Sequence, residues 1–330
     1  MPDSSWKSAF LGSLVADAFA MPVHWYYDRN ALVRDYGVVQ EFVAPKNPHA
    51  DSILWRSEYT PVNEKGDILR EQAAFWGQRG IHYHQFLEAG ENTVNYRLAA
   101  ELVRWSDGGG GYEADAWLER YIELMLTPGW HRDTYLEEYH RGFFMKYASG
   151  KAPRKCAIRD EHIGGLAQVA AVCLAAEKQD LAALRATVRE HVGLTHEHKN
   201  VQLAADTLVR LLWKIGEDVP LRDAIQSEAG DWFSAKKAER WIDLPDSQII
   251  GQKYSPACYI DQSMPASIYL AWKYHDDFFR GIQANAMVGG DNCHRGAVVG
   301  ALLGAANGVD DKWVSELHEP ALLDRVRAIS

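Results

Sequence analysis

The chain has 330 residues, 47% of them hydrophobic, which is enough apolar material to bury a large core. Its formal net charge of −10 argues against binding to nucleic acid or to an anionic membrane surface, because both need clustered Lys and Arg. Its four cysteines stand far apart and form no CxxC pair, so we expect reduced thiols in a cytoplasmic protein.

Helical periodicity dominates the chain, and no run alternates as a β-strand would. In chain order the pattern predicts helices over Ser5–Ala20, Thr93–Trp105, Ala114–Leu126, Asp133–Tyr147, Ile163–Glu177, Asp180–His191, Val201–Ile215, Leu221–Glu228, Ser267–Tyr274, Asp276–Met287, Asn292–Ala306 and Pro320–Ala328. We therefore predict an all-α protein. No flexible linker separates these segments, so we expect residues 1–330 to form a single domain.

Two segments do not follow a helical pattern. Trp25–His84 contains several Pro, Gly, Asn and aromatic residues, and Trp241–Met264 contains two prolines and a glycine. Loops of this length in compact domains are usually lids, binding loops or ordered coil.

Polar residues stand out in two of the predicted helices. Asp17 lies in an otherwise apolar helix, where a carboxylate must be paired, so we expect it to tether a neighbouring helix or loop. Glu91, Asn92 and Thr93 open the next predicted helix, and ordinary helix capping explains them more readily than a binding site does. His82-Tyr-His84 is a weak metal signal, because no third ligand stands nearby.

The densest polar cluster is Gly289-Gly-Asp-Asn-Cys-His-Arg-Gly296. The two leading glycines allow a tight turn, which puts Asp291 at the N-cap position of the helix that follows. Glycines at 296, 300, 304 and 308 form a ridge that permits close packing against another helix. A polar cluster that opens such a helix can face an ion, but a plain capped helix gives the same pattern.

Together and in this order, these segments resemble the ADP-ribosylglycohydrolase family, which includes the dinitrogenase reductase-activating glycohydrolases. Residues 12–22 look like the family's GxxxGDAxGxP helix, and residues 90–93 stand where it has Thr/Ser-Asp-Asp-Thr. Leu194-Thr-His196 matches an internal Thr-His turn, and residues 289–294 match Gly-Gly-Asp-Thr-Asp-Thr. The HYHQ, AGENT and GGDN forms resemble the branch that contains the J1 crystallins and selenoprotein J.

The resemblance implies a compact orthogonal multi-helix bundle. It also implies a pair of divalent ions, usually magnesium or manganese, between the two acidic motifs, with ADP-ribose beside them. Here Glu91 and Asn92 replace the first motif's two aspartates, Cys293 and His294 replace the last two residues of the second, and His24 stands where several relatives have Glu. Magnesium prefers oxygen ligands, whereas thiol and imidazole suit zinc or another softer ion, and a site without metal stays open.

From this resemblance we expect a hydrolase of an N- or O-glycosidic ADP-ribosyl bond, acting on a small-molecule or protein-linked ADP-ribose-like substrate. The expected catalytic residues are Asp291, Glu91 and His24. The expected ligand-binding residues are Asn92, Thr93, Asn292 and Arg295. The expected metal ligands are Glu91, Asp291, Cys293 and His294. The alternative is a catalytically silent relative, either a nucleotide-binding protein or a structural protein similar to the crystallins.

Overall fold

The computed structural model describes residues 3–107, 111–318 and 326, and this part of the chain contains helices and isolated bridges but no β-strand. The predicted all-α class is confirmed. The α-helices are α1 (Asp3–Ala20), α2 (Arg29–Tyr36), α3 (Val94–Asp107), α4 (Ala114–Leu126), α5 (Glu138–Ala148), α6 (Val169–Ala175), α7 (Leu181–Gly193), α8 (Lys199–Gly216), α9 (Leu221–Glu228), α10 (Ala235–Glu239), α11 (Asp246–Gln252), α12 (Ile260–Lys273), α13 (Phe278–Met287), α14 (Asn292–Asn307) and α15 (Asp311–Ser315).

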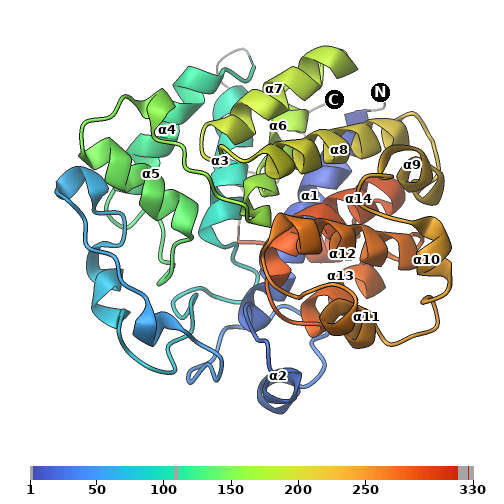
Figure 1. The fold of residues 1–330 in the computed structure, drawn as a ribbon, viewed down its shortest axis with the longest axis horizontal. Helices are drawn as coiled ribbons and strands as arrows, with labels where there is room; N and C mark the ends of the chain where they lie inside the picture. Colours follow the sequence, from blue (N-terminus) through green and yellow to red (C-terminus); the bar gives the residue numbers. More distant parts are fainter. Residues whose placement is uncertain (1–2, 108–110, 319–325, 327–330) are drawn as a thin grey trace.

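Helices α1 and α14 form the central pair of the molecule, with α6, α8, α12 and α13 packed around them (Figure 1). The predicted glycine ridge makes their contact. A Cβ added at Gly300 would lie 2.2 Å from the carbonyl oxygen of Gly12, and one at Gly304 would lie 2.4 Å from that of Ser8. Because backbone meets backbone here, the first residues of α14 are held rigidly beside the end of α1.

Three predicted helices differ from the observed ones. The helix predicted from Asp133 begins at Glu138, because the preceding residues bond to the loop before α3, as Thr134 N does to Tyr83 O. The helix predicted over Ile163–Glu177 is split into a 3-10 turn (Ile163–Leu166) and α6, since Gly165 packs tightly against Val201 and His196. The helix predicted from Ser267 begins at Ile260 and runs through Pro265.

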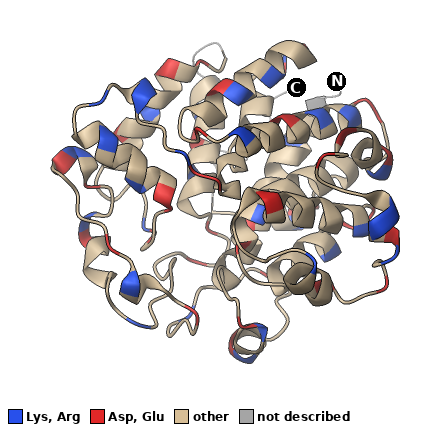
Figure 2. Cartoon of the chain, viewed as in Figure 1, with Lys and Arg blue, Asp and Glu red and all other residues tan. Residues whose placement is uncertain are grey.

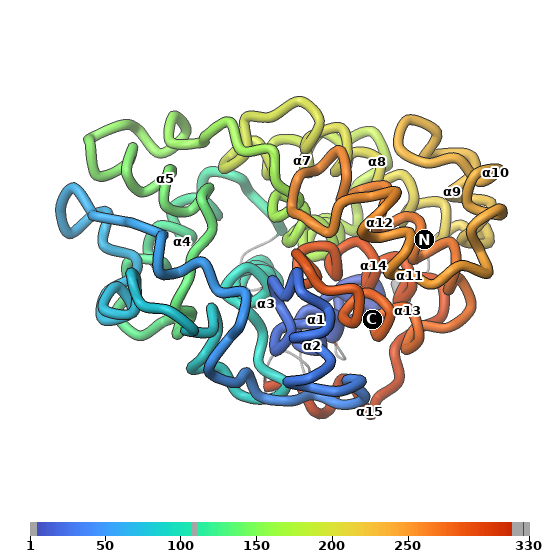
Figure 3. Tube along the Cα trace, turned by 60° about the horizontal axis from the view of Figure 1, so that its bottom comes forward, coloured from blue at the N-terminus to red at the C-terminus, as the bar shows by residue number. Residues whose placement is uncertain are grey.

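The two segments without a helical pattern are ordered. Residues 25–84 contain α2 and 3-10 turns at Leu54–Arg56, Glu64–Gly66 and Arg70–Phe75. This segment passes below α3, α4 and α5, on the side of the molecule where the chain is blue to cyan in Figures 1 and 3. Residues 241–264 contain α11 and the start of α12. The helix predicted over Pro320–Ala328 lies outside the described residues, apart from Val326.

Charged residues of both signs are interspersed over the helices (Figure 2). Among the described residues, no helix is long and apolar enough to cross a membrane.

Candidate active site

A pocket of about 360 Å³ opens beside the first turn of α14. Asp291 and His294 line its inner end, together with Glu137, the residue that precedes α5. Its walls carry Trp25, Tyr83, Tyr135 and Tyr139, and exposed Tyr27 and Tyr259 also border it. Residues from at least five distant parts of the sequence therefore meet at one cavity.

The Gly-Gly turn fixes the position of Asp291. Gly289 and Gly290 have φ of 69° and 66°, and a Cβ on them would lie 2.2 Å and 2.1 Å from backbone oxygens of Tyr26 and Pro256. Only glycine fits both conditions. Asp291 precedes α14 as predicted, but its side chain makes no capping hydrogen bond. The carboxylate is instead turned toward two imidazoles.

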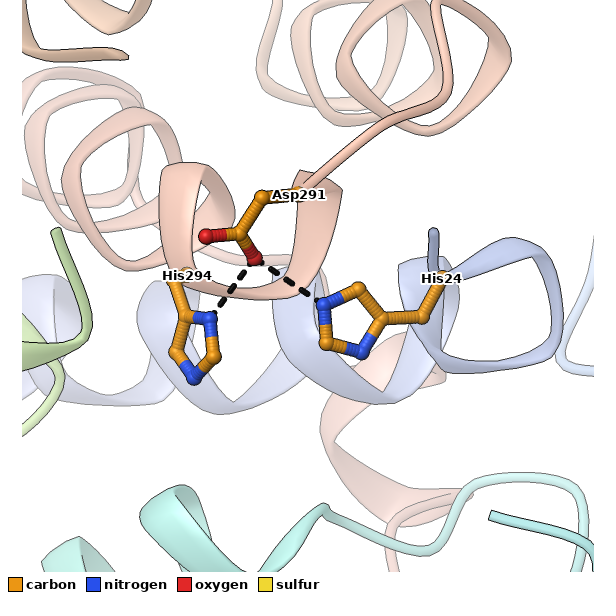
Figure 4. A group of neighbouring side chains, drawn as sticks. All are labelled: His24, Asp291 and His294. Atoms are coloured by element: carbon orange, nitrogen blue, oxygen red, sulfur yellow. Dashed lines mark hydrogen bonds and ion pairs between the residues drawn. The ribbon is translucent and has the colours of Figure 1, made fainter. Parts of the chain in front are cut away.

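His24 and His294 both face one oxygen of Asp291 (Figure 4). His24 Nε2 lies 3.0 Å and His294 Nδ1 lies 2.7 Å from Asp291 Oδ1, and all three side chains are buried. The second oxygen, Oδ2, is buried without a hydrogen-bond partner among the described residues. This carboxylate thus keeps one free acceptor in a residue that lines the pocket.

His294 lies between two carboxylates. Its Nε2 lies 3.4 Å from Glu137 Oε1 and 2.7 Å from the amide nitrogen of Asn95. Burial lowers the pKa of His294, but Asp291 and Glu137 outweigh it and raise this pKa well above the usual value. Nδ1 of the ring is hydrogen-bonded to Asp291, and Nε2 faces both Glu137 and the amide nitrogen of Asn95.

The same ion pairing keeps both carboxylates ionised. Burial raises their pKa values, but His294 outweighs it and lowers the pKa of Glu137 to about 2. His294 and His24 together hold the pKa of Asp291 well below its usual range. The pocket therefore presents two carboxylates on opposite sides of one imidazolium.

A chain of hydrogen bonds leads away from the pocket behind His24. His24 Nδ1 lies 2.8 Å from His84 Nε2, and His84 Nδ1 lies 2.6 Å from Asp133 Oδ1. Burial lowers the pKa of His24 to about 3 and of His84 to about 4, and it raises the pKa of Asp133 to about 8. Both imidazoles are neutral at pH 7, and the chain connects Asp291 to a buried carboxyl group.

The other predicted site residues lie elsewhere. Glu91 pairs with Arg132 and lies 3.6 Å from Arg97, and the thiol of Cys293 faces the carbonyl oxygen of Asp17 at 3.7 Å. Within the described residues, the group with the spacing of a metal site is His24, Asp291 and His294, whose ligand atoms lie within 4.8 Å of one another. This group contains Asp291 and His294, two of the four predicted metal ligands, but it does not contain Glu91 or Cys293.

The four predicted ligand-binding residues bond to the protein itself. Asn92 and Thr93 donate three hydrogen bonds of 2.8–2.9 Å to the carboxylate of Asp17, which confirms that Asp17 tethers the start of α3. Asn292 donates to the carbonyl oxygens of Val23 and Ala286. Arg295 is fully buried and donates to Asn285 and to the carbonyl oxygen of Gly289. None of these four residues lines the pocket beside Asp291.

The donor set of the three-residue group suits some metals better than others. Two imidazole nitrogens and one carboxylate oxygen match zinc, manganese or iron, whereas magnesium prefers oxygen alone. The unpartnered Oδ2 of Asp291 adds a further free oxygen. The residues therefore fit one ion of the softer type but not the pair of magnesium ions that the resemblance implies.

A family model described as ADP-ribosylglycohydrolase matches residues 3–329. The chain belongs to the ADP-ribosylglycohydrolase family. A solved chain of an ADP-ribosylglycohydrolase-related protein complex has the same fold, with a TM-score of 0.61 and 19% sequence identity over 99% of this chain and 96% of that chain. The comparison with curated proteins found no match.

Nothing in the sequence pointed to Glu137, Asp133 or Asn95 as residues of the site. They lie in or beside segments expected to be ordinary amphipathic helix, outside the motifs that carry the resemblance. His84 carries only the weak metal signal of the His82-Tyr-His84 pair. Its role depends on Asp133, which lies 49 residues away in the sequence.

Proposed function

We propose that the chain hydrolyses an N- or O-glycosidic bond of an ADP-ribosyl group and uses Asp291 and Glu137 as its two carboxylates. The observation that carries this proposal is their position on either side of His294 at the inner end of the pocket. Family membership supports a glycohydrolase-type reaction. Glu137 takes the catalytic place that the sequence suggested for Glu91.

Cleavage of a glycosidic bond develops positive charge at the anomeric carbon, and a pair of carboxylates stabilises that charge and handles the protons. The free Oδ2 of Asp291 is placed to accept a hydrogen bond from an attacking water and to orient it. His294, held as a cation, is the acid closest to the pocket and donates a proton to the leaving group. His24 orients Asp291 through its hydrogen bond to Oδ1.

The walls of the pocket support a nucleotide-like ligand. Trp25 packs edge-to-face against Tyr83 and Tyr135, with ring centroids 4.6 and 5.0 Å apart. Such a rigid aromatic wall suits the flat face of a base or the apolar face of a ribose. Arg56 also lines the pocket and offers a cation to a phosphate. A cytoplasmic location is part of the proposal, supported by four free cysteines.

His24, Asp291 and His294 would hold the metal ion if one takes part. Such an ion supplies a Lewis acid that orients ribose hydroxyl groups and water. Binding it requires His24 and His294 to release the protons that they share with Asp291, because a metal bonds to the free nitrogen. Titration with each metal in turn decides whether the site binds zinc, manganese or no metal.

A second proposal is a silent relative that binds a nucleotide without turnover, or a structural protein of the J1 crystallin kind. One observation favours it. Both ring nitrogens of His24, His84 and His294 already have partners in the protein, as they would in a purely structural network. The pocket beside them and the free Oδ2 of Asp291 favour the enzyme.

The test is calorimetric titration with ADP-ribose in the presence of chelator, magnesium, manganese and zinc in turn, followed by release assays on ADP-ribosylated arginine and serine peptides. We expect Asp291→Asn and Glu137→Gln to lower kcat by at least about a hundred-fold, the usual size of acid–base catalysis. Exposed Asp243→Asn is the control and should keep full activity.

Three outcomes are distinguishable. Release of ADP-ribose that depends on both carboxylates supports the enzyme. Binding without release in any metal supports the silent nucleotide-binding protein. Absence of binding under every condition rejects both of these and leaves the structural protein. Circular dichroism spectra of the two variants must match the parent for a loss of activity to count.

A further inference from the structure

Large hydrophobic side chains are exposed around the mouth of the pocket. Of the nine that are exposed among the described residues, four lie here: Tyr27, Ile53, Trp55 and Tyr259, which are 39–49% exposed. Tyr27, Ile53 and Tyr259 line the pocket, and Trp55 lies in the 3-10 turn beside Arg56, which lines it too. These residues come from three distant parts of the sequence, so the fold gathers them at one opening.

The turn that carries Ile53 and Trp55 does not need their side chains for its stability. Leu54, between them, is fully buried in a cluster with Tyr83 and anchors the turn. Ile53 N donates to the hydroxyl group of Tyr83 at 2.8 Å, and Gly77 N donates to Leu54 O at 3.0 Å. Because Leu54 and the backbone hold the turn, polar residues at positions 53 and 55 would serve the fold equally well.

Two exposed arginines lie beside the ring of Trp55. The guanidinium carbon of Arg79 is 3.9 Å from the centre of the ring, and that of Arg56 is 6.0 Å from it. In the described part of the chain, neither guanidinium forms an ion pair with a carboxylate. The exposed carboxylate among the residues that line the pocket is Glu138, which belongs to α5. The surface around Trp55 therefore offers two unpaired positive charges, in a chain whose net charge is −10.

We propose that Tyr27, Ile53, Trp55, Tyr259, Arg56 and Arg79 form a docking surface for the polypeptide that carries the ADP-ribosyl group, and that this polypeptide has acidic residues beside the modified one. The identity of the group in the pocket rests on the function proposed above. Tyr, Trp and Arg are the residue types that contribute most to protein–protein binding. Unpaired guanidinium groups bind carboxylates with paired hydrogen bonds, so this surface favours an acidic partner.

The position of the docking surface determines which kinetic constant it affects. It lies outside the pocket, so its contacts with the polypeptide are the same before and during cleavage of the glycosidic bond. Contacts of this kind lower KM and leave kcat unchanged. The preferred substrate is therefore a protein-linked ADP-ribosyl group in an acidic stretch of chain.

The test compares three conjugates of ADP-ribose, each made with serine and with arginine: the free amino acid, a peptide with glutamates on both sides of the modified residue, and the same peptide with glutamines. We expect the KM of the glutamate peptide to be lower than that of the other two by about ten-fold or more, with equal kcat, the effect of a typical interface hot spot. Trp55→Ala and Arg79→Gln should each remove this difference. Neither residue lines the pocket, so cleavage of the free amino acid conjugate should not change.

Arg280→Gln is the matched control. Arg280 is also an exposed arginine beside an aromatic ring, 5.5 Å from the centre of Tyr274, but it does not line the pocket or contact Trp55. A preference for glutamate that survives Arg280→Gln and is lost in Trp55→Ala and Arg79→Gln supports the docking surface. Equal KM values for the two peptides, or a preference that both variants retain, overturns it.

Binding is measured separately from turnover, by fluorescence anisotropy of the labelled peptide conjugates. Preferential binding of the glutamate peptide that Arg79→Gln weakens, without release of ADP-ribose, would support the docking surface and reject the proposed hydrolysis. Release of ADP-ribose without preferential binding of the glutamate peptide would reject the docking surface and support the hydrolysis. The two proposals can therefore fail independently.

Discussion

The proton count of the buried chain from Asp133 to Asp291 follows from its hydrogen bonds. His24 donates from Nε2 to the ionised Asp291, so its Nδ1 must accept from His84 Nε2. His84 Nδ1 and Asp133 Oδ1, which are 2.6 Å apart, must then share one proton. Relative to a neutral His84 and an ionised Asp133, the pair therefore holds one additional proton. This count is the same whether the proton lies on His84 Nδ1 or on Asp133 Oδ1.

This count predicts the effect of Asp133→Asn. The amide can donate to His84 Nδ1 as the shared proton does, so we expect the free energy of unfolding at pH 7 to change by less than about 1 kcal/mol, within the range of a preserved hydrogen bond. A variant that instead loses several kcal/mol would show that the negative charge of Asp133 is required.

The pH dependence gives a second readout for Asp133→Asn. In the unfolded chain, Asp133 and His84 together hold one proton between pH 4 and 6.5 and none above it, whereas the folded pair keeps its proton up to about pH 8. The pair therefore makes its full contribution to the free energy of unfolding below pH 6.5, and this contribution is lost as the pH rises to 8. Urea unfolding of the parent at pH 6.5 and 8 should show a fall that is steeper than that of the variant by about 1.4 kcal/mol per pH unit.

Single residues also show how far the sequence could predict the site. The tethering role of Asp17 could be predicted, because a carboxylate inside an apolar helix must have hydrogen-bond partners. The partners are Asn92 and Thr93. Asp291 was readable from its Gly-Gly turn and the resemblance. Its partner His24 lies 267 residues away, and the sequence pointed to that pairing only through the resemblance.

Other residues of the site could not be predicted, because their roles depend on side-chain direction. Cys293 and His294 are neighbours on α14, yet one faces Asp17 and the other faces the pocket. Adjacent helical residues point about 100° apart, so only the exact rotation of the helix decides which one reaches the site. Glu137 precedes α5 and could not be told from its exposed neighbour Glu138 by residue type.

At the scale of elements, the contact between α1 and α14 gives a sharp prediction. A Cβ at residue 300 would lie 2.2 Å from the carbonyl oxygen of Gly12, and neither backbone can move without separating the central helices. We expect Gly300→Ala to lower the free energy of unfolding by about 3 kcal/mol or more, as overpacking of a rigid core does.

Gly296→Ala is the matched control on the same helix. Its Cβ would meet its nearest neighbours, Ala16 and Asn285, at 3.4 Å, which is ordinary contact. Alanine is also favoured over glycine in a helix by about 0.5–1 kcal/mol, so we expect this variant to stay within about 1 kcal/mol of the parent. Equal losses for both variants in urea unfolding would contradict close packing at Gly300.

Most helices were predictable because their apolar faces repeat with the helical period, as in α8, where Ala204, Leu208, Leu211 and Leu212 are all buried. The exceptions arise where tertiary contacts outweigh local preference. Helix α12 runs through Pro265 because its buried face packs against α14 and α13, and such packing gives helices most of their stability. The turns within residues 25–84 depend on contacts across the chain, such as His49 Nε2 with the carbonyl oxygen of His24.

At the scale of the whole molecule, the buried histidines make the fold sensitive to acid. Burial lowers the pKa of His24, His49, His140, His191 and His196 to about 3 or 4. Each is neutral in the folded protein but takes up a proton in the unfolded chain below about pH 6.5. Their contribution is therefore fully favourable above pH 6.5 and is lost as the pH falls, since unfolding then binds protons.

The size of this effect is comparable with the whole stability of a protein. At pH 5.5 each of these histidines favours unfolding by about 1.4 kcal/mol, and five of them by about 7 kcal/mol, against a typical total of about 5–15 kcal/mol. We expect the melting temperature to fall steeply between pH 7 and 5. The side chain of Gln in His191→Gln can still accept the hydrogen bond from Tyr112. The variant should take up one proton fewer on unfolding, so its free energy of unfolding should depend less steeply on pH. A flat profile over this range would mean that water or rearrangement lets these histidines charge inside the folded protein.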